Sequence, residues 1–252
     1  MTLDRPSLKR RAVEIIKSSQ PKVMYVVVAY VVLTLIFGML SARLMGVNYS
    51  EEDIKNYSEY LLDENYDYAF DYLETMKPPF SSYAIDTLLT IVTSIVGAGF
   101  IIFLLNTIRG TGACLGNLLD GFGIFFRIFI LNLLEAVFIG LWSLLLVFPG
   151  IIAAYRYSMA IYLLVDHPEL SPMDCIRESK RMMTGHKAEL FVLDLSFIGW
   201  YLLSAIPVVG YFVRIWTVPY IGMTKALYYE QLCGRDISSH SIGVDPATPW
   251  QQ

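Results

Sequence analysis

Charged residues are scarce in this sequence. They make up 17% of the 252 residues, while 55% are hydrophobic and the mean hydropathy is +0.50. Soluble domains carry charge on roughly a quarter of their residues. The net charge is -4, and the basic residues lie beside apolar runs and not on an aromatic, basic face. We therefore expect no nucleic-acid partner, and the lipid bilayer is the first partner to consider.

Cysteine and histidine are too few and too scattered for a zinc centre. Cys114, Cys175 and Cys233 show no CxxC spacing, and no histidine accompanies them in the pattern of a zinc site. The topology derived below places all three cysteines on the cytoplasmic side, where free thiols are expected. The sequence predicts neither a metal ion nor a cofactor.

Catalytic signatures are also missing. The chain has no HExxH, no Walker sequence and no GxSxG. Its three histidines fall in predicted cytoplasmic loops or the tail, away from any serine in the membrane: His167, His186 and His240. We expect a protein that is not an enzyme and has no catalytic residue.

Long apolar runs are the main positive feature of the chain. A helix needs about 20 such residues to cross about 30 Å of hydrocarbon. Residues 23–42 and 87–108 meet this requirement. The first run ends without a signal-peptide cleavage site, so it is predicted to be a retained helix.

Two further runs are each too long for one crossing. Residues 128–165 contain the turn signature Pro149-Gly150, and residues 190–229 contain Pro207 and Gly210. Each run is predicted to form two helices. The predicted fold is an all-α, polytopic bundle with six transmembrane helices.

Lysine and arginine predict how this bundle is oriented. Both are frequent in residues 1–22 and in the loop 166–189, whereas the loop 47–83 has nine acidic residues and two lysines. We therefore predict a cytoplasmic segment 1–22, a membrane domain 23–232 with its outer loop at 47–83, and a cytoplasmic tail 233–252. The expected location is a cell membrane, with both termini in the cytoplasm.

Two cytoplasmic segments are predicted to be amphipathic helices on the membrane surface. Within residues 1–22, one face collects Leu8, Ala12, Ile15 and Ile16. A second helix begins with the capping sequence at Ser171 and ends near Gly185. Its predicted lipid-facing edge consists of Met173, Ile176, Lys180 and Met183.

The acidic outer loop is predicted to be helical, because residues 50–53 resemble a capping box. It also holds seven of the 17 tyrosines: Tyr49, Tyr57, Tyr60, Tyr66, Tyr68, Tyr72 and Tyr83. One interpretation is an interfacial cap over the bundle. The other is a platform for a cationic or peptidic ligand.

Polar residues inside the hydrocarbon are the candidate ligand-binding residues, since each buried charge costs at least a few kcal/mol. They are Glu135, Arg156, Asp194 and Asn132. From the turn at Pro149, Glu135 lies roughly 21 Å down one helix and Arg156 about 10 Å down the next, so an ideal hairpin does not pair them. Arg156 could instead reach the outer headgroups. Asp194 could be hydrated near the cytoplasmic surface or meet Lys187, or it could be a buried hydrogen-bonding residue.

Several segments together resemble a known family. They are residues 148–152 (FPGII), 155–160 (YRYSMA), 179–180 (SK), 183–187 (MTGHK) and 191–200 (FVLDLSFIGW). With these segments the sequence resembles the bacterial integral membrane proteins catalogued as domain of unknown function 975. The resemblance implies a multi-pass protein of the bacterial plasma membrane with no established activity, and the acidic outer loop has no counterpart in it.

The preferred hypothesis is a non-enzymatic membrane protein that binds, or helps to move, a small or peptidic ligand. The alternative is a membrane scaffold that recruits a partner through its cytoplasmic helices. A secondary transporter and a membrane hydrolase are further alternatives. Six helices could also associate into a homo-oligomer.

Overall fold

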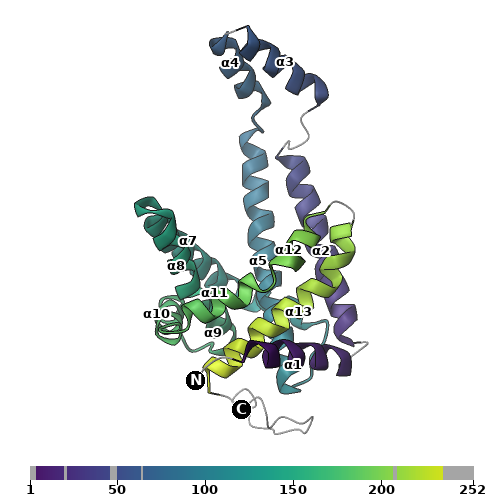
Figure 1. The fold of residues 1–252 in the computed structure, drawn as a ribbon, viewed down its shortest axis with the longest axis vertical. Coiled ribbons are helices and arrows are strands. Elements are labelled where there is room, and N and C mark those ends of the chain that lie inside the picture. The colour runs from purple at the N-terminus through teal and green to yellow at the C-terminus, as the bar shows by residue number, and fades with distance from the viewer. Residues whose placement is uncertain (1–3, 20–21, 46–49, 64, 207–208, 235–252) are drawn as a thin grey trace. The chain divides into compact units, whose positions relative to one another are not determined.

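The structure is a computed structural model that describes residues 4–19, 22–45, 50–63, 65–206 and 209–234. This part of the chain is helical and contains no strand (Figure 1), as the all-α prediction requires. It forms two compact units. The first comprises residues 1–31 with 95–252, and the second comprises residues 32–94.

Four helical segments are long and apolar enough to cross a membrane: Val23–Leu44, Phe80–Arg109, Phe125–Leu144 and Val147–Asp166. They coincide with the first four predicted spans. The corresponding elements are α2 (Lys22–Leu44), α5 (Phe80–Arg109), α7 (Phe125–Leu145), α8 (Val147–Tyr157) and α9 (Ala160–Asp166).

The hairpin between α7 and α8 turns at Leu146, whose backbone is extended. Pro149 lies in the first turn of α8, where its missing N–H removes no helical hydrogen bond. Gly150 is buried, and a Cβ there would overlap the side chain of Ser143. The Pro-Gly pair therefore does not form the turn itself. Pro149 is compatible with a helix that begins immediately after Leu146, and Gly150 allows α8 to pack closely against α7.

The fourth candidate span is interrupted between α8 and α9, and α10 (Pro172–Met182) stabilises the break. The Ser179 hydroxyl donates to the Arg156 carbonyl oxygen at 3.0 Å and accepts from the Met159 amide at 3.2 Å. One buried side chain from α10 thus bonds backbone groups on both sides of the interruption.

The predicted fifth helix is two short helices, α11 (Lys187–Leu195) and α12 (Ile198–Ser204). The chain turns at Ser196 and Phe197, and the Phe197 ring is fully buried against Tyr220. Lys9 donates to the Ser196 carbonyl oxygen at 3.4 Å and lies over the Phe197 ring at 4.4 Å. The apolar residues of this segment predicted one continuous helix, so the turn was not expected from the sequence.

The last helix is α13 (Val209–Leu232), which contains Pro219, Arg214 and Lys225. The predicted break at Pro207 lies outside the described residues, as does the tail from residue 235 onwards. The C-terminal half of α13 is the centre of the core, with Met223, Ala226, Leu227, Tyr228 and Tyr229 fully buried.

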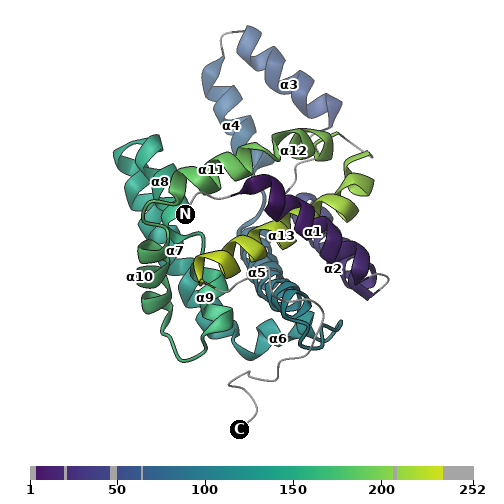
Figure 2. The ribbon, with the colours of Figure 1, turned by 60° about the horizontal axis from the view of Figure 1, so that its bottom comes forward.

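Both predicted amphipathic helices bury their apolar faces in protein. In α1 (Arg5–Ser18), Leu8, Ala12 and Ile16 are buried and the helix packs along α13 (Figures 1 and 2). In α10 and its C-cap, two of the four predicted lipid-facing residues, Ile176 and Met183, are buried instead, because α10 packs against α7, α8 and α9, whereas Met173 and Lys180 are exposed. The helical pattern identified the covered face but not what covers it.

Close backbone contact joins α5 to α6 (Asn117–Gly123). A Cβ on Gly99 would overlap the Leu118 carbonyl oxygen, and one on Gly121 would overlap that of Ile95. The loop before α6 turns through Gly110 and Gly112, both with positive φ.

The second unit contains α3 (Glu51–Leu62) and α4 (Tyr66–Met76), so most of the loop 47–83 is helical. The predicted capping box is present: the Asp53 amide donates to Ser50 Oγ at 3.0 Å, and the Ser50 amide donates to Asp53 Oδ2 at 2.9 Å. Within the same unit, the Ser41 hydroxyl donates to Asp86.

Candidate functional site

Three charged side chains meet at the ends of three helices in the first unit. Arg109 ends α5, Asp166 ends α9 and Glu230 lies near the end of α13. Arg109 Nη1 lies 2.6 Å from Asp166 Oδ1, while its Nε and Nη2 lie 2.8 and 2.6 Å from Glu230 Oε1. The two carboxylates are 4% and 3% exposed and the guanidinium 22%.

Aromatic and histidine side chains extend this ionic network. The Tyr229 hydroxyl donates to Asp166 Oδ2 at 2.9 Å, and Tyr162 stacks on Tyr229 with 5.3 Å between ring centroids. His167 Nε2 lies 3.7 Å from the same Asp166 oxygen. Buried carboxylates are stable only when they are paired and hydrogen-bonded, so this network fixes the ends of α5, α9 and α13 together.

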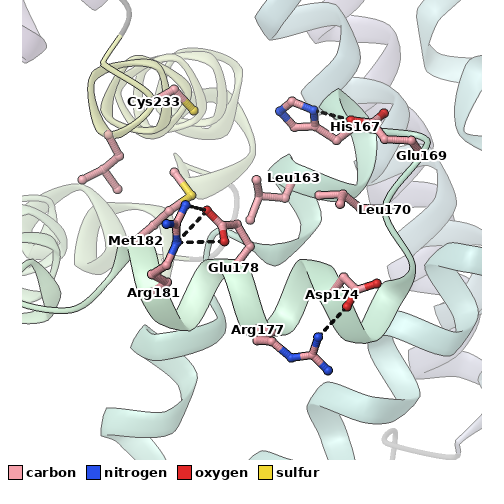
Figure 3. Close-up of a pocket in the computed structure, with 11 residues that line it drawn as sticks. Leu163, His167, Glu169, Leu170, Asp174, Arg177, Glu178, Arg181, Met182 and Cys233 are labelled. Carbon is pink, nitrogen blue, oxygen red and sulfur yellow. Dashed lines mark hydrogen bonds and ion pairs between the residues drawn. The ribbon is translucent and has the colours of Figure 1, made fainter.

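A pocket of about 710 Å³ lies beside the network (Figure 3). Its walls come from the end of α9, the loop 167–171, α10 and the end of α13. Apolar groups on the walls are Leu163, Leu170, Met182 and Leu232, together with Cys233.

Three pairs of opposite charge surround these apolar groups (Figure 3). The pairs are Arg177 with Asp174 at 2.8 Å, Arg181 with Glu178 at 2.9 Å, and His167 with Glu169 at 2.9 Å. A backbone hydrogen bond and then the one to His167 lower the pKa of Glu169. The Arg177 and Arg181 side chains are 74% and 80% exposed, so both still have donors available to a ligand.

Local sequence explains how the pocket is built. Ser171 caps α10 by accepting from the Asp174 amide at 3.2 Å, and Pro172 follows at the first helical position, as predicted. Gly185, with φ of 87°, turns the chain after α10. From α7, Arg127 donates to the Leu170 carbonyl oxygen and so holds the pocket loop in place.

The lining of the pocket includes one thiol, Cys233, and one imidazole, His167. In Figure 3 the Cys233 thiol and the His167 ring lie on different sides of the pocket. Cys175 is buried under α10, and burial raises the pKa of its thiol to about 11, which makes it unreactive. Within the described part of the chain, no three His, Cys, Asp or Glu side chains could together hold a metal ion.

The four residues predicted from the sequence do not gather into one site, and none of them lines this pocket. Asp194 on α11 pairs with Lys225 on α13 at 2.9 Å, not with Lys187. Glu135 and Arg156 are half-buried, and no ion pair joins them in the described structure. Asn132 is half-buried on α7, one turn before Glu135.

Sequence reasoning missed the network of Arg109, Asp166 and Glu230. Each residue stands at the end of an apolar helix, where a charge is ordinarily solvated and attracts no notice. The available signal was that all three positions lie at helix ends on the predicted cytoplasmic side. Their pairing depends on helix packing across 57 and 121 residues of sequence.

The second half of the chain resembles a known protein family. Residues 143–236 match the family model described as Protein of unknown function (DUF975). The resemblance noted in the sequence is thereby confirmed over these residues. The DUF975 stretch includes every residue that lines the pocket, whereas Arg109 and Arg127 lie before it. No curated protein and no solved structure matches the chain.

Proposed function

We propose that this chain is a non-enzymatic, multi-pass membrane protein that binds a small or peptidic ligand in the pocket between α9, α10 and the end of α13. The pocket itself carries the proposal. Its volume of about 710 Å³ falls among those of known ligand sites, roughly 300 to 1,000 Å³. Its mixture of apolar walls and charged edges suits an amphiphilic ligand with a polar or charged group.

The proposed placement has six crossings, with both termini in the cytoplasm of a bacterial cell. The four long apolar helices support the first four crossings. Support for the other two, through α11 with α12 and through α13, comes from large apolar side chains on their surfaces: Leu195, Ile198, Leu202 and Phe212. In this placement the pocket opens on the cytoplasmic side.

The ionic network beside the pocket supports a binding role because it fixes the pocket walls. Arg109 connects the helix that precedes the pocket loop to the helix that closes the pocket. A rigid wall loses less conformational entropy on binding than a mobile one. Asp166 and His167, adjacent in the chain, belong to the network and to the pocket edge respectively.

Native mass spectrometry of the purified protein tests this proposal. A bound molecule should appear as a mass adduct on the wild-type chain and be lost from Leu163→Trp, which fills the pocket. Leu119→Trp is the matched control, since Leu119 is exposed on α6 and does not line the pocket. Identical spectra for all three proteins would contradict the proposal.

A membrane scaffold that recruits a partner is the second candidate function. The observation that favours it is the exposure of Arg177 and Arg181 on α10. In that case Arg177→Gln with Arg181→Gln should abolish capture of the partner, while Leu163→Trp should leave capture unchanged. The opposite pattern favours the ligand pocket.

A further inference from the structure

The His167 ring lies between two carboxylates at the edge of the pocket. Its Nδ1 is 2.9 Å from Glu169 Oε1, and its Nε2 is 3.7 Å from Asp166 Oδ2. The first distance is that of a hydrogen bond, and the second is that of an ion pair. Figure 3 shows the contact between His167 and Glu169. Both nitrogens of the ring therefore have an acidic partner.

A neutral imidazole cannot donate to both carboxylates. It carries one N–H and one lone pair, whereas the protonated ring carries an N–H on each nitrogen. When Nδ1–H donates to Glu169, the lone pair of Nε2 faces the Asp166 oxygen. The other neutral tautomer places a lone pair 2.9 Å from the Glu169 oxygen. The observed arrangement therefore fits the protonated form of His167.

The buried network beside the ring also favours a positive charge there. Asp166 and Glu230 are 4% and 3% exposed, and both bond to the guanidinium of Arg109. Two carboxylates thus share one guanidinium, and burial makes an uncompensated charge costly. A proton on His167 places a second positive charge beside Asp166.

Glu169 keeps its charge in the pH range where a histidine loses its own. A backbone hydrogen bond and then the one to His167 lower the pKa of Glu169, so this carboxyl group is ionised near neutral pH. A histidine side chain ordinarily changes charge between about pH 5 and 8. The other charged or titratable groups around the network and the pocket are Arg109 of α5, Arg127 of α7, Asp174, Arg177, Glu178 and Arg181 of α10, and Tyr229, Glu230 and Cys233 of α13.

His167 is the first residue of the loop that forms one wall of the pocket. Glu169 and Leu170 of this loop line the pocket. The far end of the loop is held by Arg127, which donates to the Leu170 carbonyl oxygen, and by the Ser171 cap of α10. The contacts of His167 attach the near end to the buried network. Loss of the positive charge weakens this attachment and leaves the wall less rigid.

We propose that His167 binds a proton between Asp166 and Glu169 and that this proton fixes the pocket wall. The protonated ring donates toward both carboxylates and so links the loop to the end of α9. Because a rigid wall loses less entropy on binding, the pocket binds more tightly when His167 is protonated. The statement about binding rests on the proposed function, whereas the proton site does not.

Hydrogen exchange of the full-length protein in nanodiscs tests the proton site without a ligand. The readout is the protection factor of the Leu170 amide, which donates to the His167 carbonyl oxygen at 3.1 Å. A protection factor already corrects for the direct effect of pH on amide exchange. We expect it to fall about threefold from about pH 6 to about pH 8, the scale of a partly exposed ion pair. In His167→Gln it should be the same at both pH values.

His186→Gln is the matched control for loss of a histidine. His186 also pairs with a carboxylate, Glu189 at 2.7 Å, but it does not line the pocket. This variant should keep the wild-type fall in protection. Glu169→Gln removes one of the two acidic partners of His167 and should reduce that fall.

Native mass spectrometry at the same two pH values tests the consequence for binding. The probe is the molecule that copurifies with the wild-type chain, followed as a mass adduct. Its occupancy should be higher at the lower pH in the wild type and equal at both pH values in His167→Gln.

Three results would overturn the proposal. The first is a wild-type protection factor that does not change with pH. The second is a fall in His167→Gln as large as that in the wild type. The third is equal adduct occupancy of the wild type at both pH values. Absence of any adduct would contradict the proposed function instead, and the exchange experiment would still decide the proton site.

Discussion

Arg109 is the residue on which the buried charges of the first unit depend. Asp166 and Glu230 are almost completely buried, and both bond to its guanidinium. Removal of one partner from a buried ion pair typically costs about 3 to 5 kcal/mol, because the remaining charge stays desolvated.

Arg109→Met should therefore lower the free energy of unfolding by about 3 kcal/mol. Thermal unfolding followed by tryptophan fluorescence in nanodiscs measures the change. Arg181→Met is the control, since that arginine is exposed and solvent screens its pair with Glu178. Equal losses of unfolding free energy in the two variants would show that the buried network stabilises the protein no more than an exposed ion pair does.

The ion-pair partner of Asp194 could not be predicted from the sequence. Asp194 was predicted to be a charge in an apolar segment near Lys187, and in the structure it pairs with Lys225. The partner lies 31 residues away on another helix. Sequence distance favoured Lys187, whereas helix packing decided the pairing.

At the scale of elements, close helix contact depends on glycine. Gly121 in α6 lies against the Ile95 carbonyl oxygen of α5, whereas a Cβ on Gly123, two residues later, would meet nothing within 4 Å. These two positions separate the effect of contact from the effect of helix propensity.

Gly121→Ala should destabilise the protein by about 1 to 3 kcal/mol, because the backbone must move to admit a methyl group. Gly123→Ala should be neutral or slightly stabilising, since alanine favours helix over glycine. Thermal unfolding of both variants provides the measurement. A loss of stability in Gly123→Ala equal to that in Gly121→Ala would contradict the close crossing.

Element boundaries were predictable where a local signal exists. The caps at Ser50 and Ser171 and the hairpin near Pro149 all follow from side chains within a few residues. The turn at Phe197 could not be predicted from nearby residues, because burial of its ring depends on α13 and its contact with Lys9 depends on α1. The partners that cover the apolar faces of α1 and α10 were hidden for the same reason.

At the scale of the whole molecule, the sequence predicted a helical fold with six spans, and the described structure has four helical segments long and apolar enough to cross a membrane. The sequence could not predict the pocket, whose walls are brought together by packing between residues 163 and 233. In the proposed placement, this pocket lies on the cytoplasmic side and the helices α3 and α4 lie outside, with α11, α12 and α13 completing six crossings.

Cysteine accessibility tests that placement most directly. Single cysteines are introduced by Glu59→Cys, Arg177→Cys and Ile206→Cys in a chain carrying Cys114→Ser and Cys233→Ser, and intact cells are treated with a membrane-impermeant maleimide. In the proposed placement, positions 59 and 206 are labelled in intact cells and position 177 is labelled only after permeabilisation. Labelling of position 177 from outside, or of position 206 only after permeabilisation, would contradict it.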